Sequence, residues 1–256
     1  MRVPTSSSDD SAVDVLFDTP ARWRAEIITE FRLREAERCA AASPTPGFPQ
    51  LLESVISALD DASDGPWLDV GGGLGGTASW IERTHHQHVI VADAARGSLR
   101  AARRLFPSLD LTAACAASLP IRDNSVAVAI VSGVLSLLHD ADPLFAELRR
   151  VLCRHGRVAV TDLWSADSIT FSDHPNTFWS LERIAEVAQR WGFEVLHLAA
   201  ADLSTGWWSS SAAQVNDEII ERHVGEPGFD VWREDLDHLD AIISSGRVIP
   251  AGLVLG

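Results

Sequence analysis

Five glycines fall within the six positions 71–76, and this cluster is the feature that most constrains how the chain can fold. It follows directly on the apolar run Trp67–Val70 and precedes a stretch with the periodicity of an amphipathic helix. Glycines in such a loop allow a sharp turn and let the backbone approach a bound ligand without Cβ atoms in the way. The order strand, glycine loop, helix predicts the first β-α unit of a parallel sheet.

Short apolar runs alternate with amphipathic stretches along the chain after this loop, which is typical of an α/β fold. The run at 126–132 is apolar on both faces, as a central parallel strand requires. We predict a Rossmann-like, seven-stranded, mostly parallel sheet with helices on both faces. The predicted strands are Trp67–Val70, Val89–Asp93, Leu109–Ala113, Val126–Ser132, Val158–Asp162, Phe193–Leu198 and Ala251–Leu255.

The pattern divides the chain into an N-terminal part, residues 1–60, and a main domain, residues 61–256. The first part is predicted to be a polar tail and a helical cap, with helices over 21–40 and 49–59. Residues 202–246 are predicted to be a helical insertion before the last strand, and we expect this insertion to cover the carboxyl edge of the sheet as a lid. Pro250 is expected only at the start of the last strand, because proline cannot donate to a sheet ladder.

Composition excludes several classes of function. The chain has 256 residues, enough for one main domain, and a formal net charge of -15, which argues against nucleic acid or an anionic membrane as a partner. Every basic residue is arginine, so Schiff-base chemistry on a lysine is excluded. The first ten residues lack the pattern of a secretory signal, and no apolar run is long enough to span a membrane. We therefore expect a cytoplasmic protein.

Cysteine and histidine are not arranged as metal ligands. The three cysteines are widely spaced and form no Cys-x-x-Cys unit. The histidines at 85, 86 and 88 precede the second predicted strand, at the edge of the sheet opposite the expected ligand site, and are interpreted as a solvated turn. No metal site is predicted.

The glycine loop alone leaves two classes of cofactor open. Gly71, Gly73 and Gly76 fit the G-x-G-x-x-G pattern of dinucleotide enzymes, and Asp93 follows about twenty residues later at the end of the next strand. A carboxylate at that position accepts ribose hydroxyls from either cofactor. The residues that follow the loop favour one of them.

The continuation resembles class I S-adenosylmethionine (SAM)-dependent methyltransferases that act on small molecules. The resemblance covers residues 67–198. It is carried by Asp69, Ser118-Leu119-Pro120, Arg122-Asp123-Asn124-Ser125, Ser132 with Val134 and Leu135, Asp142-Pro143, Glu147, Arg150-Val151-Leu152 and His155-Gly156-Arg157. The N-terminal Leu16-Phe17-Asp18, Ala21 and Trp23 are similar to the entry helix of some members, with Trp23 where a tyrosine is usual.

This resemblance implies a cofactor site. The glycines would border the methionine and ribose parts of SAM, Asp93 would hold both ribose hydroxyls, and Asp69 would lie near the amino end of the cofactor. One ionised carboxylate can accept two hydroxyl donors, and an acidic pocket suits a sulfonium and an ammonium. The implied cofactor residues are Trp23, Asp69, Gly71, Gly72, Gly73, Gly75, Asp93, Ala94, Cys115, Ala116 and Ser132. S-adenosylhomocysteine (SAH) would be the product.

One segment departs from the family pattern. Ala114-Cys115-Ala116 stands where the family has Gly-Asp-Ala, so the aspartate that would accept from the adenine amino group is missing. Loss of such a hydrogen bond costs about 1 kcal/mol, which SAM binding can survive.

Methyl transfer from a sulfonium needs alignment more than acid-base chemistry, so a dedicated base is not required. Two histidines are candidates for a base, His139 after the fourth predicted strand and His174 after the fifth. His139 can equally cap a turn, and His174 can shape a loop ahead of Pro175. Four tryptophans, Trp164, Trp179, Trp207 and Trp208, are predicted to wall the acceptor pocket, which favours an aromatic or apolar metabolite methylated on oxygen, nitrogen or carbon.

Three other functions remain open at this point. The same fold serves enzymes of secondary metabolism that cyclise or rearrange a substrate without methyl transfer. A nicotinamide-dependent oxidoreductase would share the glycine loop but leaves the segments around Leu119 and Asp123 unexplained. A non-catalytic partner protein would keep the fold without cofactor binding. The sequence is compatible with a monomer or a homodimer.

Overall fold

The computed structural model describes residues 14–59, 64–166, 169–170, 176–201, 206 and 208–256. One sheet of seven strands has the order β3-β2-β1-β4-β5-β9-β8, in which β1 to β5 are parallel and β9 is antiparallel to both of its neighbours. The strands are β1 (Trp67–Val70), β2 (Val89–Asp93), β3 (Asp110–Ala113), β4 (Val126–Ser132), β5 (Leu152–Ser165), β8 (Val195–Ala200) and β9 (Val248–Leu255). A second, two-stranded sheet pairs β6 (Ile169–Thr170) with β7 (Thr177–Phe178) in antiparallel orientation. The predicted seven-stranded, mostly parallel sheet is confirmed.

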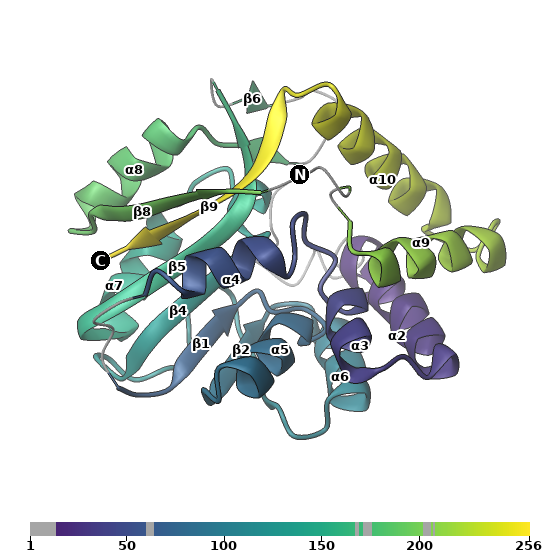
Figure 1. The fold of residues 1–256 in the computed structure, drawn as a ribbon, viewed down its shortest axis with the longest axis horizontal. Helices are drawn as coiled ribbons and strands as arrows, with labels where there is room; N and C mark the ends of the chain where they lie inside the picture. Colours follow the sequence, from purple (N-terminus) through teal and green to yellow (C-terminus); the bar gives the residue numbers. More distant parts are fainter. Residues whose placement is uncertain (1–13, 60–63, 167–168, 171–175, 202–205, 207) are drawn as a thin grey trace.

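Helices cover both faces of the sheet (Figure 1). Residues of β4 contribute to two separate hydrophobic cores. Val128 and Ile130 pack with α5, with α6 and with the N-terminal helices, whereas Ala129 and Val131 pack with α7 and α8. The fully apolar strand is therefore explained by burial on both faces. The helices are α2 (Thr19–Phe31), α3 (Glu35–Ala41), α4 (Gln50–Ile56), α5 (Gly76–Thr84), α6 (Arg96–Leu105), α7 (Asp142–Val151), α8 (Leu181–Arg190), α9 (Ser210–Arg222) and α10 (Phe229–Ser244), with the short turns η1 (Asp14–Asp18) and η2 (Leu135–Leu137).

Several predicted element boundaries were wrong. The strand expected at Val158–Asp162 spans Leu152–Ser165, and the strand expected at Phe193–Leu198 lies at Val195–Ala200. The single helix expected over 21–40 is two helices, because Arg32 adopts a left-handed backbone (φ 49°) and ends α2. The last strand begins at Val248, so Pro250 lies inside it and not at its start. The Pro250 carbonyl accepts from the amide of Ala201, which lies just beyond the end of β8. Proline has no N–H to donate, but because Pro250 faces a residue outside β8, no hydrogen bond to β8 is lost and the sheet tolerates it.

Gly76 allows the N-terminal helices to approach the glycine loop closely. A Cβ at this position would lie 2.4 Å from the carbonyl oxygen of Cys39 and 2.8 Å from the amide nitrogen of Ser43. The hydroxyl groups of Ser43 and Thr77 lie 2.5 Å apart at the same junction. The end of α3 is thereby fixed against the beginning of α5, where the glycine loop ends.

The helices α2, α9 and α10 lie together on one side of the molecule (Figure 1). Trp23 of α2 is fully buried there and stacks on His223, with ring centroids 4.7 Å apart. Its indole N–H donates to the carboxylate of Glu226 at 3.1 Å, and the same carboxylate accepts from Nδ1 of His223 at 2.8 Å. These contacts hold the α9–α10 hairpin on the N-terminal helix.

Among the described residues, none of the helices has both the length and the apolar composition that a membrane crossing requires.

Candidate functional site

A cavity of about 760 Å³ lies at the carboxyl ends of the parallel strands. Its wall is formed by the glycine loop after β1, the segments that follow β2, β3, β4 and β5, the N-terminal helices, and the α9–α10 hairpin. Ligands of open α/β sheets bind at this edge, where the strand order reverses between β1 and β4. The cavity therefore lies at the sheet edge where the sequence predicts a ligand site.

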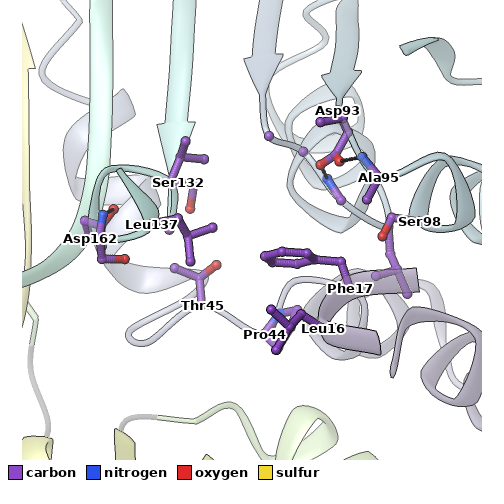
Figure 2. A pocket seen from close by; sticks show the side chains of 18 of the residues that line it. Leu16, Phe17, Pro44, Thr45, Asp93, Ala95, Ser98, Ser132, Leu137 and Asp162 are labelled. Atoms are coloured by element: carbon purple, nitrogen blue, oxygen red, sulfur yellow. Dashed lines mark hydrogen bonds between the residues drawn. The ribbon is translucent and has the colours of Figure 1, made fainter. Parts of the chain in front are cut away.

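Asp93 ends β2 with its carboxylate fixed by the backbone. One oxygen accepts from the amide of Gly73 at 2.8 Å and the other from the amide of Ala95 at 2.7 Å (Figure 2). Burial raises the pKa of Asp93, and the two amide hydrogen bonds oppose that shift. Each oxygen retains a lone pair, so the carboxylate can accept two further hydroxyl donors from the cavity.

The second carboxylate, that of Asp69 at the third position of β1, is buried. It is 1% exposed, and one of its oxygens has no hydrogen-bond partner among the described residues. Burial, together with repulsion from Asp93, raises its pKa to about 7, although the Ala78 amide donates to it. A Cβ on Gly72 would lie 2.6 Å from this carboxylate oxygen, so the close approach requires glycine. A buried acceptor without a donor fits a cationic or N–H-bearing ligand group.

The N-terminal segment forms the outer wall beside Asp93. Asp18 accepts from the amide of Ser98 at 3.1 Å, at the beginning of α6. A Cβ on Gly97 would lie 2.3 Å from the Asp18 carboxyl carbon, so this contact depends on glycine. Figure 2 shows Asp93, Ala95 and Ser98 on one side of the cavity and Ser132, Leu137 and Asp162 on the other, with Phe17 between the two groups.

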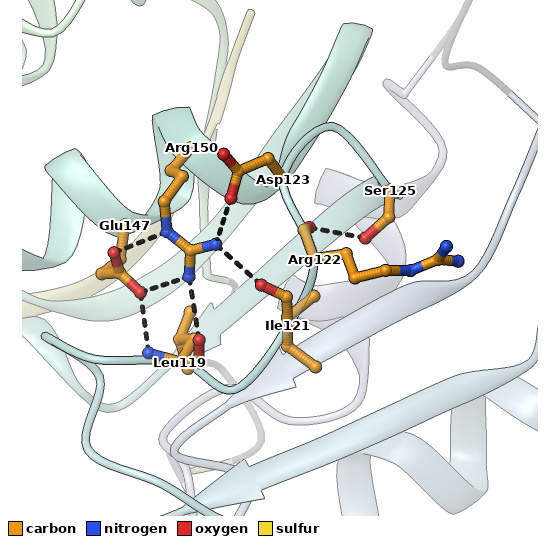
Figure 3. Close-up of polar contacts among 7 residues, drawn as sticks. All are labelled: Leu119, Ile121, Arg122, Asp123, Ser125, Glu147 and Arg150. Carbon is orange, nitrogen blue, oxygen red and sulfur yellow. Dashed lines mark hydrogen bonds and ion pairs between the residues drawn. The ribbon is translucent and has the colours of Figure 1, made fainter.

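Cys115 and Ala116 line the cavity in the segment after β3. This segment continues into a loop that Arg150 of α7 clamps with its guanidinium (Figure 3). The guanidinium donates to the carbonyls of Leu119 and Ile121 and to the carboxylates of Asp123 and Glu147, all at 2.6–2.8 Å. Hydrogen bonding to Arg150 lowers the pKa of Glu147, which also accepts from the Leu119 amide.

Replacing Arg150 by methionine is expected to lower the free energy of unfolding by about 2–3 kcal/mol, because several charge-assisted hydrogen bonds are lost together. The segment that carries Cys115 would lose its anchor as well. Urea denaturation measures the first effect. Arg122→Met is the matched control, since the Arg122 guanidinium points away from this network (Figure 3) and the expected change is within about 0.5 kcal/mol. Equal losses for the two variants would contradict the assignment.

The opposite half of the cavity is lined mostly by apolar side chains and includes one buried carboxylate, Asp162 near the end of β5, which is 3% exposed. Its oxygens accept from the amides of Leu163 at 2.7 Å and Ser136 at 3.2 Å. Burial raises its pKa, and these hydrogen bonds oppose the shift. The apolar side chains of this half are Leu137, Leu138, Leu163, Trp208, Trp232, Leu236 and Leu239.

Most of the residues that the sequence singles out meet in this cavity. Its wall includes Asp69, Gly71, Gly72, Gly73, Asp93, Ala94, Cys115, Ala116, Ser132, His139 and Trp208. His139 lies 2.8 Å from the Thr177 hydroxyl through Nδ1. His174 and Trp207 lie outside the described residues.

Four of the singled-out residues do not line the cavity. Gly75 directly precedes α5, and its missing Cβ leaves room for Leu109. Trp23 packs in the α2–α9–α10 contact described above. Trp164 is 2% exposed and donates to the carbonyl of Ala251, while Trp179 donates to the carbonyls of Leu135 and Leu138 and so supports the turn behind the cavity wall. Both N–H groups are used to satisfy backbone carbonyls.

The structure adds wall residues that the sequence did not indicate. These are chiefly Arg24, Thr45, Asp162 and Asn216. Asp162 directly follows four apolar or small residues of a predicted strand, which is a signal similar to that of Asp93. Arg24 and Asn216 belong to helices far apart in the sequence, and no local pattern brings them together.

The sheet order places the glycine loop and Asp93 at the carboxyl ends of two neighbouring strands of an α/β fold, which is the edge where such folds bind ligands. Residues 68–160 match the family model of the methyltransferase domain. This matched segment runs from β1 into β5 and contains both the glycine loop and Asp93. A comparison with curated protein sequences gives no match.

Several solved structures share the fold. The [4+2]-cyclase SpnF is 20% identical, with a TM-score of 0.67 and coverage of 80% of either chain. A SAM-dependent methyltransferase from Thiobacillus denitrificans, in complex with SAH, is 17% identical, with a TM-score of 0.63 over 86% of this chain and 96% of that one. Phosphoethanolamine N-methyltransferase 2 from Haemonchus contortus, in complex with SAM, is also 17% identical, with a TM-score of 0.63 over 82% of this chain, which spans 53% of that enzyme.

Proposed function

We propose that the protein binds SAM in this cavity and transfers its methyl group to a small-molecule acceptor. The observation that carries the proposal is the pair of carboxylates at the ends of β1 and β2. Asp93 is held by two amides with lone pairs left for a diol, and Asp69 is buried with one oxygen unpartnered. A ribose diol and an α-ammonium group would satisfy these two acceptors at once.

SAM, when bound, supplies an activated methyl group on a sulfonium centre. The residues of the chain would hold the reactants in line and exclude water, which can provide most of the rate acceleration. Asp93 would orient the ribose, Asp69 would bind the ammonium, and the segment at Cys115 would receive the adenine. The Arg150 clamp keeps that segment in place.

The acceptor would occupy the half of the cavity opposite Asp93. Its leucine and tryptophan walls suit an aromatic or otherwise apolar metabolite, methylated on oxygen, nitrogen or carbon. His139 is the described histidine that could accept a proton from an acidic acceptor, and Asp162 could orient a hydroxyl or amine. Residues 202–246 would act as the acceptor-side cover, because Trp208 and three residues of α10 face the apolar half. A cytoplasmic enzyme of secondary metabolism, monomeric or homodimeric, fits this assignment.

A second candidate reaction is cyclisation or rearrangement without methyl transfer. It is supported by Cys115 in place of the expected adenine-binding aspartate and by the similarity to a [4+2]-cyclase. The two reactions differ in one product, because only methyl transfer releases SAH.

The test is calorimetric titration of the purified protein with SAM and SAH, followed by incubation with SAM and a panel of apolar phenols, amines and acidic carbon compounds. Micromolar binding and acceptor-dependent SAH release would support methyl transfer. Binding of SAM with substrate conversion but without SAH release would support the cyclase. Failure of the wild type to bind either nucleoside would overturn both.

A further inference from the structure

The cavity wall contains one deeply buried cation, the guanidinium of Arg24 on α2. The side chain lines the cavity, yet the residue is only 6% exposed. Its Nη1 donates to the carbonyl of Ala41 at 3.1 Å, and its Nη2 donates to the side-chain oxygen of Asn216 on α9. Both partners are neutral, and the remaining N–H groups of the guanidinium are open to other acceptors.

No described carboxylate neutralises this charge. Arg24 forms no ion pair within the described part of the chain, and burial alone lowers its pKa, to about 10. At neutral pH the guanidinium is therefore charged, buried and without a counter-ion. Taking a cation out of water without a paired anion is costly, and buried charges in proteins are ordinarily paired. The unpaired guanidinium of Arg24 is explained if a bound ligand supplies the negative charge that neutralises it.

The position of Arg24 narrows the chemistry of that anion. Ala41 ends α3, and the residues just after it pack against Gly76 and Thr77 at the beginning of α5. The guanidinium thus lies on the glycine-loop side of the cavity. A guanidinium presents parallel N–H groups that match the two oxygens of a carboxylate.

We propose that Arg24, oriented by Asn216, is the carboxylate-binding residue of this cavity. The carboxylate would come from the amino-acid end of the cofactor or from an acidic acceptor. The proposal rests on the proposed function for the first of these sources. Because Arg24 and Asn216 lie on α2 and α9, the bound carboxylate would also be enclosed between the N-terminal helix and the α9–α10 hairpin.

The experiment compares the wild type with Arg24→Met, using SAM and decarboxylated SAM, which keeps the sulfonium and amine but has no carboxylate. The wild type is expected to bind SAM about tenfold to a hundredfold more tightly than decarboxylated SAM. Arg24→Met is expected to lose most of this preference while its affinity for decarboxylated SAM stays unchanged or rises. Arg22→Met is the matched control, since Arg22 lies on the same helix with its side chain 52% exposed.

A second titration distinguishes the source of the carboxylate. With SAH saturating, benzoate and its neutral amide, benzamide, are added to the same three proteins. An unchanged preference for SAM, together with benzoate binding that Arg24→Met abolishes, assigns the site to an acidic acceptor. An unchanged preference without Arg24-dependent benzoate binding overturns the proposal. Equal weakening of SAM and decarboxylated SAM overturns it too, because that result indicates a purely structural role.

Two further controls distinguish a failure of this proposal from misfolding of Arg24→Met and from a failure of the proposed function. If Arg24→Met does not fold, Arg24→Lys retains the charge without the paired N–H geometry, and an intermediate preference for SAM is expected. An Arg24→Lys preference identical to that of the wild type would contradict the paired geometry. If the wild type binds neither SAM nor decarboxylated SAM, the proposed function fails, whereas binding of both with no Arg24 effect removes only this inference.

Discussion

Asp93→Asn is expected to weaken SAH binding by about a hundredfold or more. The substitution removes the charge that would accept both ribose hydroxyls, and two charge-assisted hydrogen bonds together contribute about 3 kcal/mol or more. The carboxamide also presents its NH₂ group to the amide of Gly73 or Ala95, so one of the present hydrogen bonds must be lost. Isothermal titration calorimetry at pH 8 measures the change.

The matched control for this variant is Asp110→Asn. Asp110 begins the neighbouring strand β3 and has a side chain 67% exposed, with His88 as its partner. Its substitution is expected to leave SAH affinity within about twofold of the wild type. If folded Asp93→Asn also retained wild-type affinity, Asp93 would not be the ribose ligand and the assignment of the cofactor site would be wrong.

The sequence predicts the sheet well because burial on two faces leaves a simple signal. Four of the predicted strands, including the central Val126–Ser132, begin and end within one residue of the observed strands β1 to β4. Asp69 and Asp93 could be predicted for the same reason, since each lies in or at the end of such a strand. The local sequence pattern is sufficient to predict a site residue when its position depends on a single strand.

Prediction from sequence is weaker where side chains on distant elements decide the outcome. Trp164 is expected in the acceptor pocket because it follows the predicted strand Val158–Asp162, but it lies within β5, and its buried indole N–H donates to the Ala251 carbonyl. Arg24 has the spacing of an ordinary helix residue, and only the packing of α2 on α9 brings Asn216 to it. The break at Arg32 depends on a left-handed backbone that arginine does not signal.

Asp69 is expected to make the ligand-free protein less stable as pH rises from about 4 to about 7. Its pKa is raised from 3.8 in the unfolded chain to about 7 in the fold, so over this interval the unfolded chain is ionised while the folded protein keeps the proton. Unfolding then releases a proton, and stability falls by about 1.4 kcal/mol for each pH unit. The contribution of Asp69 is constant below this interval and again above it.

Asp69→Asn removes that ionisation. The variant is therefore expected to be more stable than the wild type at pH 8, by on the order of 3–4 kcal/mol, with the difference shrinking toward zero at pH 4. Urea denaturation at several pH values measures it, and Asp110→Asn provides the control, for which no such trend is expected. A difference that does not change with pH would show that Asp69 is ionised throughout this range in the folded protein.

The same carboxylate is expected to make cofactor binding depend on pH in the opposite sense. An ammonium group binds the ionised form, so below pH 7 binding must first remove the proton, and SAH affinity should fall about tenfold for each pH unit. Asp69→Asn should bind SAH weakly and without this dependence. If Asp69→Asn is more stable than the wild type but binds SAH more weakly, the buried carboxylate contributes to ligand binding and lowers the stability of the fold. Full retention of SAH affinity by Asp69→Asn would instead show that the Asp69 carboxylate does not bind the cofactor.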